Sequence, residues 1–207
     1  MVFLVLSLAG GSVVVTDATG RMLPARLYYA SPGQVNYLIP AATAAGIATV
    51  TITSIGIVAA RSQIQIAPVA PGLFTLNAAN LAAAYVTRFN PNGEQTIEQG
   101  YQRDASGNLV PAPIDFRSGG STVYLTVFGT GIRNVANAGG VTAAVGPAFN
   151  LPVTYAGAQG LIEGLDQVNI RLPSGPGNPL TFQTSYRAAL QVTVDGQPSN
   201  RVMLTIQ

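Results

Sequence analysis

The sequence contains no cysteine, histidine, tryptophan or lysine, and each absence narrows the range of functions. Without cysteine the chain has neither disulfides nor thiolate metal sites. Without histidine it lacks the commonest general base, the usual member of a catalytic triad and the usual zinc ligand. The missing tryptophan weakens an aromatic platform for sugars. These absences favour a non-enzymatic protein, and we expect no cofactor.

Charge is also scarce, at 9% of residues against about 25% in typical globular domains. All cationic residues are arginines, spread singly from Arg21 to Arg201, and the formal net charge is +2. Because the basic footprint of a nucleic-acid-binding protein is clustered, we expect no nucleic acid partner. A surface made of Thr, Ser, Asn, Gln and backbone suits a stalk or a packed assembly.

Apolar residues and turn formers are abundant instead. The apolar fraction of the 207 residues is 48%, which is ample for a packed core. The 23 glycines and 14 prolines disfavour long helices and favour frequent turns. Short β-branched runs between these turns predict an all-β protein. Two units of about 100 residues each would match the usual size of an immunoglobulin-like sandwich.

One short stretch occurs twice. Residues 34–40 read Gln-Val-Asn-Tyr-Leu-Ile-Pro, and residues 167–173 read Gln-Val-Asn-Ile-Arg-Leu-Pro. A Tyr-Ala pair precedes each copy, and a β-rich run follows each. We therefore predict two tandem immunoglobulin-like β-sandwich domains related by an internal repeat.

A proline-containing segment, Ala67–Gly72, marks the expected boundary, because two prolines stiffen it and remove backbone donors. The predicted domains are residues 1–68 and residues 69–207. In the second, residues near 90–113 carry turn signals and a polar stretch with no counterpart in the first. We expect an inserted, exposed loop region there, and such loops tend to carry function.

The apolar start of the chain, Met1–Leu8, has no basic residue near it and is too short to span a bilayer, which takes about 20 residues. A buried strand is favoured over the remnant of a signal peptide. The same run could instead be donated to the sheet edge of a neighbouring molecule, as in strand-addition assembly. The candidate residues of this assembly strand are Val2, Phe3, Leu4, Val5 and Leu6.

The repeated strand supplies one candidate site. Gln34 and Asn36 lie two residues apart and share a sheet face, as do Gln167 and Asn169. These amides could form a polar ladder that faces a ligand, or they could satisfy backbone groups of a neighbouring loop. Their occurrence in both halves favours the structural role.

The inserted region supplies two further candidates. Tyr101 is the tyrosine best placed for contact with a ligand such as a sugar. Asp104, Ser106 and Asn108 offer oxygen donors at alternate positions, as in a calcium loop, but the bidentate glutamate and the flanking helices are missing. A plain turn is favoured, and no metal is expected.

Carboxylates are few, and Glu163 with Asp166 is the least unfavourable pair for a glycosidase. Such an enzyme needs two carboxylates across a cleft, a separation that a sequence cannot establish. Loop acids in water, with Asp166 capping the entry to a strand, are the favoured interpretation.

Several motifs, taken in order, resemble the Solibacter-type uncharacterised C-terminal domain family of Acidobacteria, over nearly the whole chain from Gly11. They are residues 28–36 (Tyr-Tyr-Ala-Ser-Pro-Gly-Gln-Val-Asn), 70–74 (Ala-Pro-Gly-Leu-Phe), 127–132 (Val-Phe-Gly-Thr-Gly-Ile), 155–157 (Tyr-Ala-Gly) and 164–169 (Gly-Leu-Asp-Gln-Val-Asn). The resemblance implies a C-terminal module of long exported bacterial proteins, with a tandem immunoglobulin-like fold related to IPT/TIG domains. It implies no catalytic residue.

The function expected from these features is a non-enzymatic structural or adhesion module of an exported bacterial surface protein, located outside the cell or at its surface. Its partners would be proteins, either further copies or neighbouring domains, without a membrane span. The first alternative is a self-assembling surface filament that uses residues 1–8 for strand addition. The second is a carbohydrate-binding module, which would need a line of exposed aromatic side chains.

Overall fold

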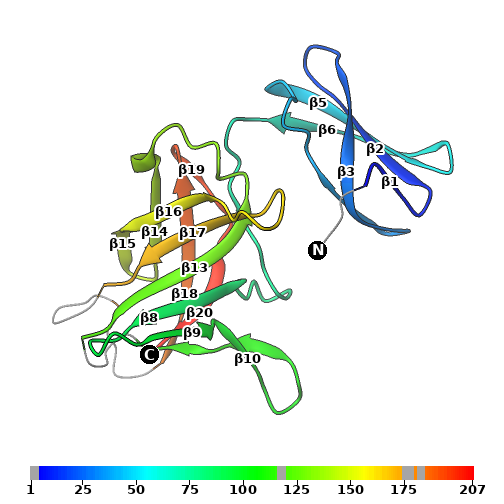
Figure 1. Ribbon diagram of the computed structural model, residues 1–207. Coiled ribbons are helices and arrows are strands. Elements are labelled where there is room, and N and C mark those ends of the chain that lie inside the picture. Colours follow the sequence, from blue (N-terminus) through cyan, green and yellow to red (C-terminus); the bar gives the residue numbers. More distant parts are fainter. Residues whose placement is uncertain (1–4, 116–119, 174–179, 181–184) are drawn as a thin grey trace. The chain divides into compact units, whose positions relative to one another are not determined.

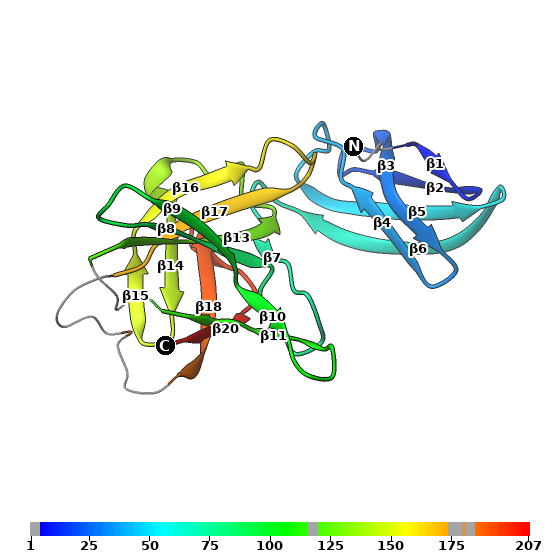
Figure 2. The same cartoon turned by 60° about the horizontal axis from the view of Figure 1, so that its bottom comes forward.

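The computed structural model describes residues 5–115, 120–173, 180 and 185–207. The chain forms two compact units, Met1–Pro68 and Val69–Gln207. Most of their strands are labelled in Figure 1, and β4 is labelled in Figure 2. The boundary falls within the proline-containing segment. Every described strand pairing except β12 with β20 and the single bridge Leu81–Met203 is antiparallel, and the prediction of an all-β protein is confirmed.

The first unit is one sheet of six strands in the order β4-β3-β2-β5-β6, with β1 paired to β2. Short turns rich in Gly, Asp and Pro connect its strands, so each strand lies beside a neighbour in sequence. The strands are β1 (Ser7–Leu8), β2 (Gly11–Thr16), β3 (Met22–Ser31), β4 (Gln34–Leu38), β5 (Gly46–Ser54) and β6 (Ile57–Ile66).

The core of the first unit lies on one face of this sheet. Alternate apolar residues point there, because side chains alternate between the two faces of a strand. Apolar residues at both ends of the sheet, in β4 and β6, pack against this core but are only partly buried. The buried residues of the core are Val13, Val15, Ala25, Leu27, Ala48 and Val50.

The start of the chain pairs within its own unit. Val5 and Leu27 exchange two backbone hydrogen bonds, with N···O distances of 3.4 and 2.7 Å. Leu8 and Gly11 are partners in the hairpin of β1 and β2. The prediction of a buried strand is wrong for Val5 and Leu6, which are 37% and 53% exposed. Val5 joins the sheet only by an isolated bridge to Leu27, and β1 itself begins at Ser7. The other three residues of the predicted assembly strand, Val2, Phe3 and Leu4, lie outside the described residues.

The second unit has two six-stranded sheets and a separate hairpin, β10–β11. One sheet has the order β12-β20-β18-β14-β15, with β19 on β18; the other has the order β16-β17-β13-β8-β9, with β7 on β13. In Figure 2, β8, β13 and β17 lie in one layer, and β14 and β18 lie in the other.

The elements of this unit are β7 (Gly72–Leu73), β8 (Ala84–Phe89), β9 (Gln95–Gln99), β10 (Tyr101–Arg103), β11 (Leu109–Pro111), β12 (Pro113–Ile114), β13 (Thr122–Thr130), the 3₁₀ helix η1 (Ala138–Gly140), β14 (Val141–Val145), β15 (Ala148–Leu151), β16 (Val153–Ala158), β17 (Asp166–Arg171), β18 (Tyr186–Val194), β19 (Gln197–Pro198) and β20 (Val202–Ile206).

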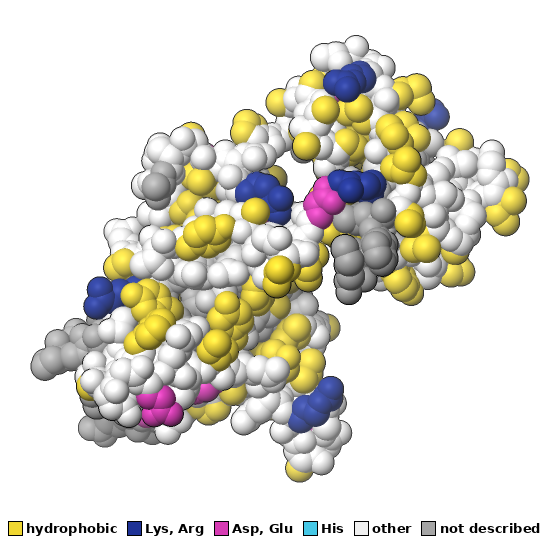
Figure 3. Space-filling view, viewed as in Figure 1, with side chains coloured by type: hydrophobic (Ala, Val, Ile, Leu, Met, Phe, Trp, Pro, Cys, Tyr) yellow, Lys and Arg dark blue, Asp and Glu magenta, His cyan; other side chains and the backbone are white. Residues whose placement is uncertain are grey.

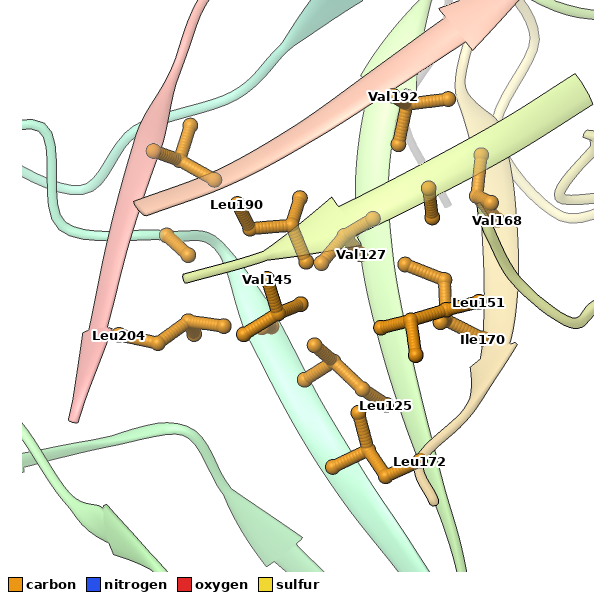
Figure 4. Close-up of a cluster of buried hydrophobic side chains, with 14 of the residues drawn as sticks. Leu125, Val127, Val145, Leu151, Val168, Ile170, Leu172, Leu190, Val192 and Leu204 are labelled. Atoms are coloured by element: carbon orange, nitrogen blue, oxygen red, sulfur yellow. The ribbon is translucent and has the colours of Figure 1, made fainter. Parts of the chain in front are cut away.

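Buried aliphatic residues from both sheets form one continuous core. Figure 4 shows Leu125 and Val127 of β13 in the same cluster as Val145 of β14 and Leu190 of β18. Each of these four side chains is at most 1% exposed. The second unit is therefore β-sandwich-like, with its strands alternating between buried and solvent-facing residues.

The region near residues 90–113, predicted as an inserted loop, contains short strands. Its first half contains β9, which pairs along its whole length with β8 and forms the edge of a main sheet. Its second half contains the hairpin β10–β11, closed by the turn at Asp104–Gly107, and the start of β12. The strands here are short and polar, and their side chains are mostly exposed, so the hydrophobic alternation that marks a strand is weak.

Candidate functional site: the paired amide strands β4 and β17

The two copies of the Gln-Val-Asn sequence form β4 and β17, each as the second strand of an antiparallel hairpin. In the first unit Asn36 lies opposite Tyr29 of β3. In the second unit Asn169 lies opposite Tyr155 of β16. The tyrosine of each Tyr-Ala pair thus faces the asparagine of its own unit.

An irregularity of the backbone occurs at the same place in both hairpins. The register shifts between Leu27 and Tyr29 in β3 and between Val153 and Tyr155 in β16. A bulge of this kind bends a strand and increases its local twist. The two hairpins therefore agree in register, in the position of the bulge and in the residues that face each other.

The amide side chains make the same hydrogen bond in both units. Gln34 Nε2 donates to Asn36 Oδ1 at 2.7 Å, and Gln167 Nε2 donates to Asn169 Oδ1 at 2.8 Å. Among the described residues, the partner observed for each glutamine side chain is the asparagine of its own strand. Each amide pair links two side chains of one strand, on the face opposite the core.

The surroundings of the two strands differ. β17 lies between β16 and β13, and Thr126 Oγ1 of β13 donates a second hydrogen bond to Asn169 Oδ1 at 3.1 Å. β4 ends its sheet, and among the described strands only β3 pairs with it. Asn169 is half-buried as a result, whereas Asn36 is exposed.

Of the two carboxylates suggested as an enzymatic pair, Asp166 is buried and forms an ion pair with the partly exposed Arg133. Its Oδ1 accepts a hydrogen bond from Arg133 Nε at 2.6 Å, and its Oδ2 accepts one from the Ile132 backbone N–H at 2.8 Å. Asp166 is 1% exposed, whereas Glu163 lies on the exposed surface. The Asp166 carboxylate therefore fastens the segment after β13 to the start of β17.

The oxygens of the proposed calcium loop serve the turn itself. Asp104 Oδ1 accepts hydrogen bonds from the backbone N–H groups of Ser106 and Asn108, both at 2.9 Å. Its Oδ2 accepts one from Asn108 Nδ2 at 3.3 Å. These bonds hold the pKa of the Asp104 carboxyl below its usual value, and the two bonds from Asn108 contribute most. The arrangement is that of a turn closed by an aspartate side chain.

Tyr101 lies in β10, opposite Pro111 of β11, and its side chain is half-buried. Tyr101 therefore lies in a strand of the hairpin and not at its tip. The tip is formed by the Asp104 turn, where Arg103 Nη1 donates to the carbonyl of Gly107 at 2.6 Å.

A further aspartate, Asp17, holds a turn of the first unit with its side chain. Asp17 Oδ1 accepts hydrogen bonds from Thr19 Oγ1 at 2.6 Å and from the Arg21 N–H at 3.1 Å, and Oδ2 accepts one from the distant Ala44 N–H at 3.1 Å. These bonds lower the pKa of Asp17 from 3.8 to about 2, and the bond from the Thr19 hydroxyl contributes most. Only the Asp-x-Thr-Gly pattern signalled a turn, and no local signal pointed to Ala44.

Within the part of the chain that the structure describes, His, Cys, Asp and Glu residues do not gather in threes at any place that could hold a metal ion. The same residues include no helix that is long and apolar enough to cross a membrane.

Comparison with known proteins found no matching family model and no matching curated protein. The resemblance to the Solibacter-type C-terminal domain family therefore stays a prediction from the motifs.

Proposed function

We propose that the chain is a non-enzymatic structural or adhesion module of an exported bacterial surface protein, built from two units that share one hairpin design. The observation that carries this proposal is the matched pair of hairpins. Strand register, bulge and amide bond agree in both units, as expected when one building unit is used repeatedly in an elongated protein.

The use of the polar side chains supports a structural role. Asp17, Asp104 and Asp166 each accept several hydrogen bonds within their own unit. In β4 and in β17 the glutamine donates to the asparagine of the same strand, and Asn169 also accepts a bond from Thr126. Such groups hold strands and turns in place. On the face shown in Figure 3, charged side chains form small, separate groups among apolar and uncharged surface. This pattern suits a module that packs against neighbours.

The described part of the apolar start argues against the filament alternative, because Val5, Ser7 and Leu8 pair with β3 and β2 of their own unit. Residues engaged in this way would have to leave their own sheet before they could join another. The carbohydrate alternative requires a row of exposed aromatic rings, and its best candidate, Tyr101, is half-buried.

The proposal is tested in the organism that makes the protein, with an antibody against the purified chain. Intact cells are labelled, and a second sample is treated with an added protease before lysis and blotting. We expect labelling of intact cells and loss of the protein after protease treatment, while a cytoplasmic protein in the same lysate stays intact. Protection equal to that of the cytoplasmic protein would refute the surface location.

A further inference from the structure

The second unit shows which element belongs beside a Gln-Val-Asn strand. β13 runs antiparallel to β17, with Leu125 opposite Ile170 and Val127 opposite Val168. Between these two pairs, Thr126 lies opposite Asn169 and donates its hydroxyl to the amide oxygen. β13 thus covers the outer edge of β17 with an alternating pattern of aliphatic residue, hydroxyl residue and aliphatic residue.

The corresponding edge of β4 has no partner among the described strands. Val35 and Tyr37 hold the places that Val168 and Ile170 hold in β17, since both pairs flank the asparagine of their strand. Val168 and Ile170 are fully buried, whereas Val35 and Tyr37 are only partly buried. The apolar residues of β4 are therefore incompletely covered, and a strand added at the edge of β4 could cover them.

The opposite end of the sheet shows the same difference. β6 pairs with β5, with Ile66 of β6 opposite Gly46. β20 pairs with β18, with Ile206 of β20 opposite Tyr186. Ile206 is fully buried, whereas Ile66 is partly buried. The core of the first unit is thus less covered at both ends than the corresponding strands of the second unit, where β13 pairs with β17 and β12 pairs with β20.

Proteins commonly protect a strand edge with charges, proline or a bulge, because its unpaired N–H and C=O groups invite another strand. β4 has none of these within Gln34–Leu38, which reads Gln-Val-Asn-Tyr-Leu and carries no charge. Its register shift with β3 lies across from Tyr37 and Asn36, on the side that is already paired. The outer edge is therefore suited to accept an additional strand.

We propose that the outer edge of β4 binds an extended segment of another polypeptide that has the residue pattern of β13. The segment would lie antiparallel to β4, with aliphatic residues opposite Val35 and Tyr37 and a serine or threonine opposite Asn36. Its aliphatic side chains would complete the core, and its hydroxyl would bond to the Asn36 amide oxygen as Thr126 does to Asn169. This inference rests on the correspondence of β4 with β17, so the surface role proposed above can hold or fail independently of it.

The test uses the whole 207-residue chain and a fluorescent peptide with the sequence of β13, residues 122–130, flanked by lysines for solubility. Fluorescence anisotropy measures binding, and hydrogen exchange locates it. We expect saturable binding that slows exchange of the β4 amides. A peptide with aspartate in place of both inward aliphatic residues, the counterparts of Leu125 and Val127, should not bind.

Two chain variants check the position. Val35→Lys places a charge on the face that the peptide must cover and should abolish binding, whereas Val58→Lys, the same change at an exposed site of β6, should leave binding unchanged. Since Val35→Lys could also disturb folding, Asn36→Ala provides a second check. Asn36→Ala should weaken binding of the peptide about two- to tenfold, the usual effect of one hydrogen bond. A peptide with valine in place of the threonine should bind both chains equally.

Three results would overturn the proposal. The first is the absence of saturable binding. The second is binding that survives Val35→Lys and protects the amides of β17, since the peptide would then be replacing β13 in the second unit. The third is a dimer of the chain that Val35→Lys makes monomeric and that the peptide does not dissociate, since β4 would then pair with a second copy.

Discussion

At the scale of the residue, the asparagines of the two Gln-Val-Asn strands lie in different environments. Asn169 is half-buried and accepts hydrogen bonds from Gln167 and from Thr126 of the adjacent strand. Asn36 is exposed and accepts the bond from Gln34 alone. When a hydrogen-bond acceptor is removed from a buried site, its donors are left unsatisfied, whereas at an exposed site water takes over as the acceptor. The same substitution should therefore have unequal effects in the two units.

We predict that Asn169→Ala lowers the free energy of unfolding of the second unit by about 1–3 kcal/mol, because Thr126 and Gln167 both lose an acceptor. Asn36→Ala, the matched control, should lower that of the first unit by less than about 1 kcal/mol. Urea unfolding followed by circular dichroism measures both. Equal losses would show that the hydrogen bond from β13 contributes nothing.

A second prediction at this scale concerns pH. The pKa of Asp17 is lowered from 3.8 to about 2 in the folded chain, so its ionised form stabilises the first unit above about pH 4. This stability is lost as the pH falls from about 4 through about 2, because the protonated carboxyl gives up its acceptor role. The melting temperature of the wild type should fall over this range more than that of Asp17→Asn. Parallel curves for the two proteins would exclude Asp17 as a source of the pH dependence.

At the scale of the element, the degree to which neighbouring residues bury a strand determines how much its apolar side chains contribute to the free energy of unfolding. Leu172 follows β17 and is 1% exposed, whereas Ile39, at the same place after β4, is only partly buried. Deletion of buried methyl groups costs transfer energy and leaves a cavity, and the cavity forms only where neighbours enclose the site.

We therefore predict that Leu172→Ala costs about 2–5 kcal/mol, and that Ile39→Ala costs about 1 kcal/mol because water already reaches part of its side chain. Each substitution is measured by urea unfolding of the whole chain, with the transition of the affected unit analysed separately. A cost for Ile39→Ala as large as that for Leu172→Ala would mean that the first unit encloses its core as fully as the second.

The sequence predicted elements where the local signals were strong. The Gln-Val-Asn strands form where they were expected, and the turn signals near residue 90 correspond to a turn at residues 90–93, before β9. It failed at Val5 and Leu6, since an apolar run does not reveal whether a second layer exists to cover it. The open edge of β4 was equally unpredictable, because strand order depends on contacts between distant residues.

At the scale of the whole molecule, the two units have cores of very different size. Among the described residues, 26 buried apolar residues form the core of the second unit and six form that of the first. Burial of apolar surface is the main favourable term in folding, so the larger core should be the more stable.

We predict that the whole chain unfolds in two steps, with the first unit unfolding at the lower temperature or urea concentration. The upper step should coincide with the single transition of residues 69–207 made alone. Circular dichroism with calorimetry provides this comparison. One cooperative transition in the whole chain, well above that of residues 69–207, would show that the units stabilise each other.

Hydrogen exchange of individual amides in β4 and β17, followed by NMR, tests the central claim that one strand design is fully enclosed in the second unit and open at one edge in the first. Because β17 pairs on both edges, all of its amides should be protected. Because β4 pairs only with β3 among the described strands, its amides should alternate between slow and fast exchange. Uniform protection along β4 in the free chain would contradict the account.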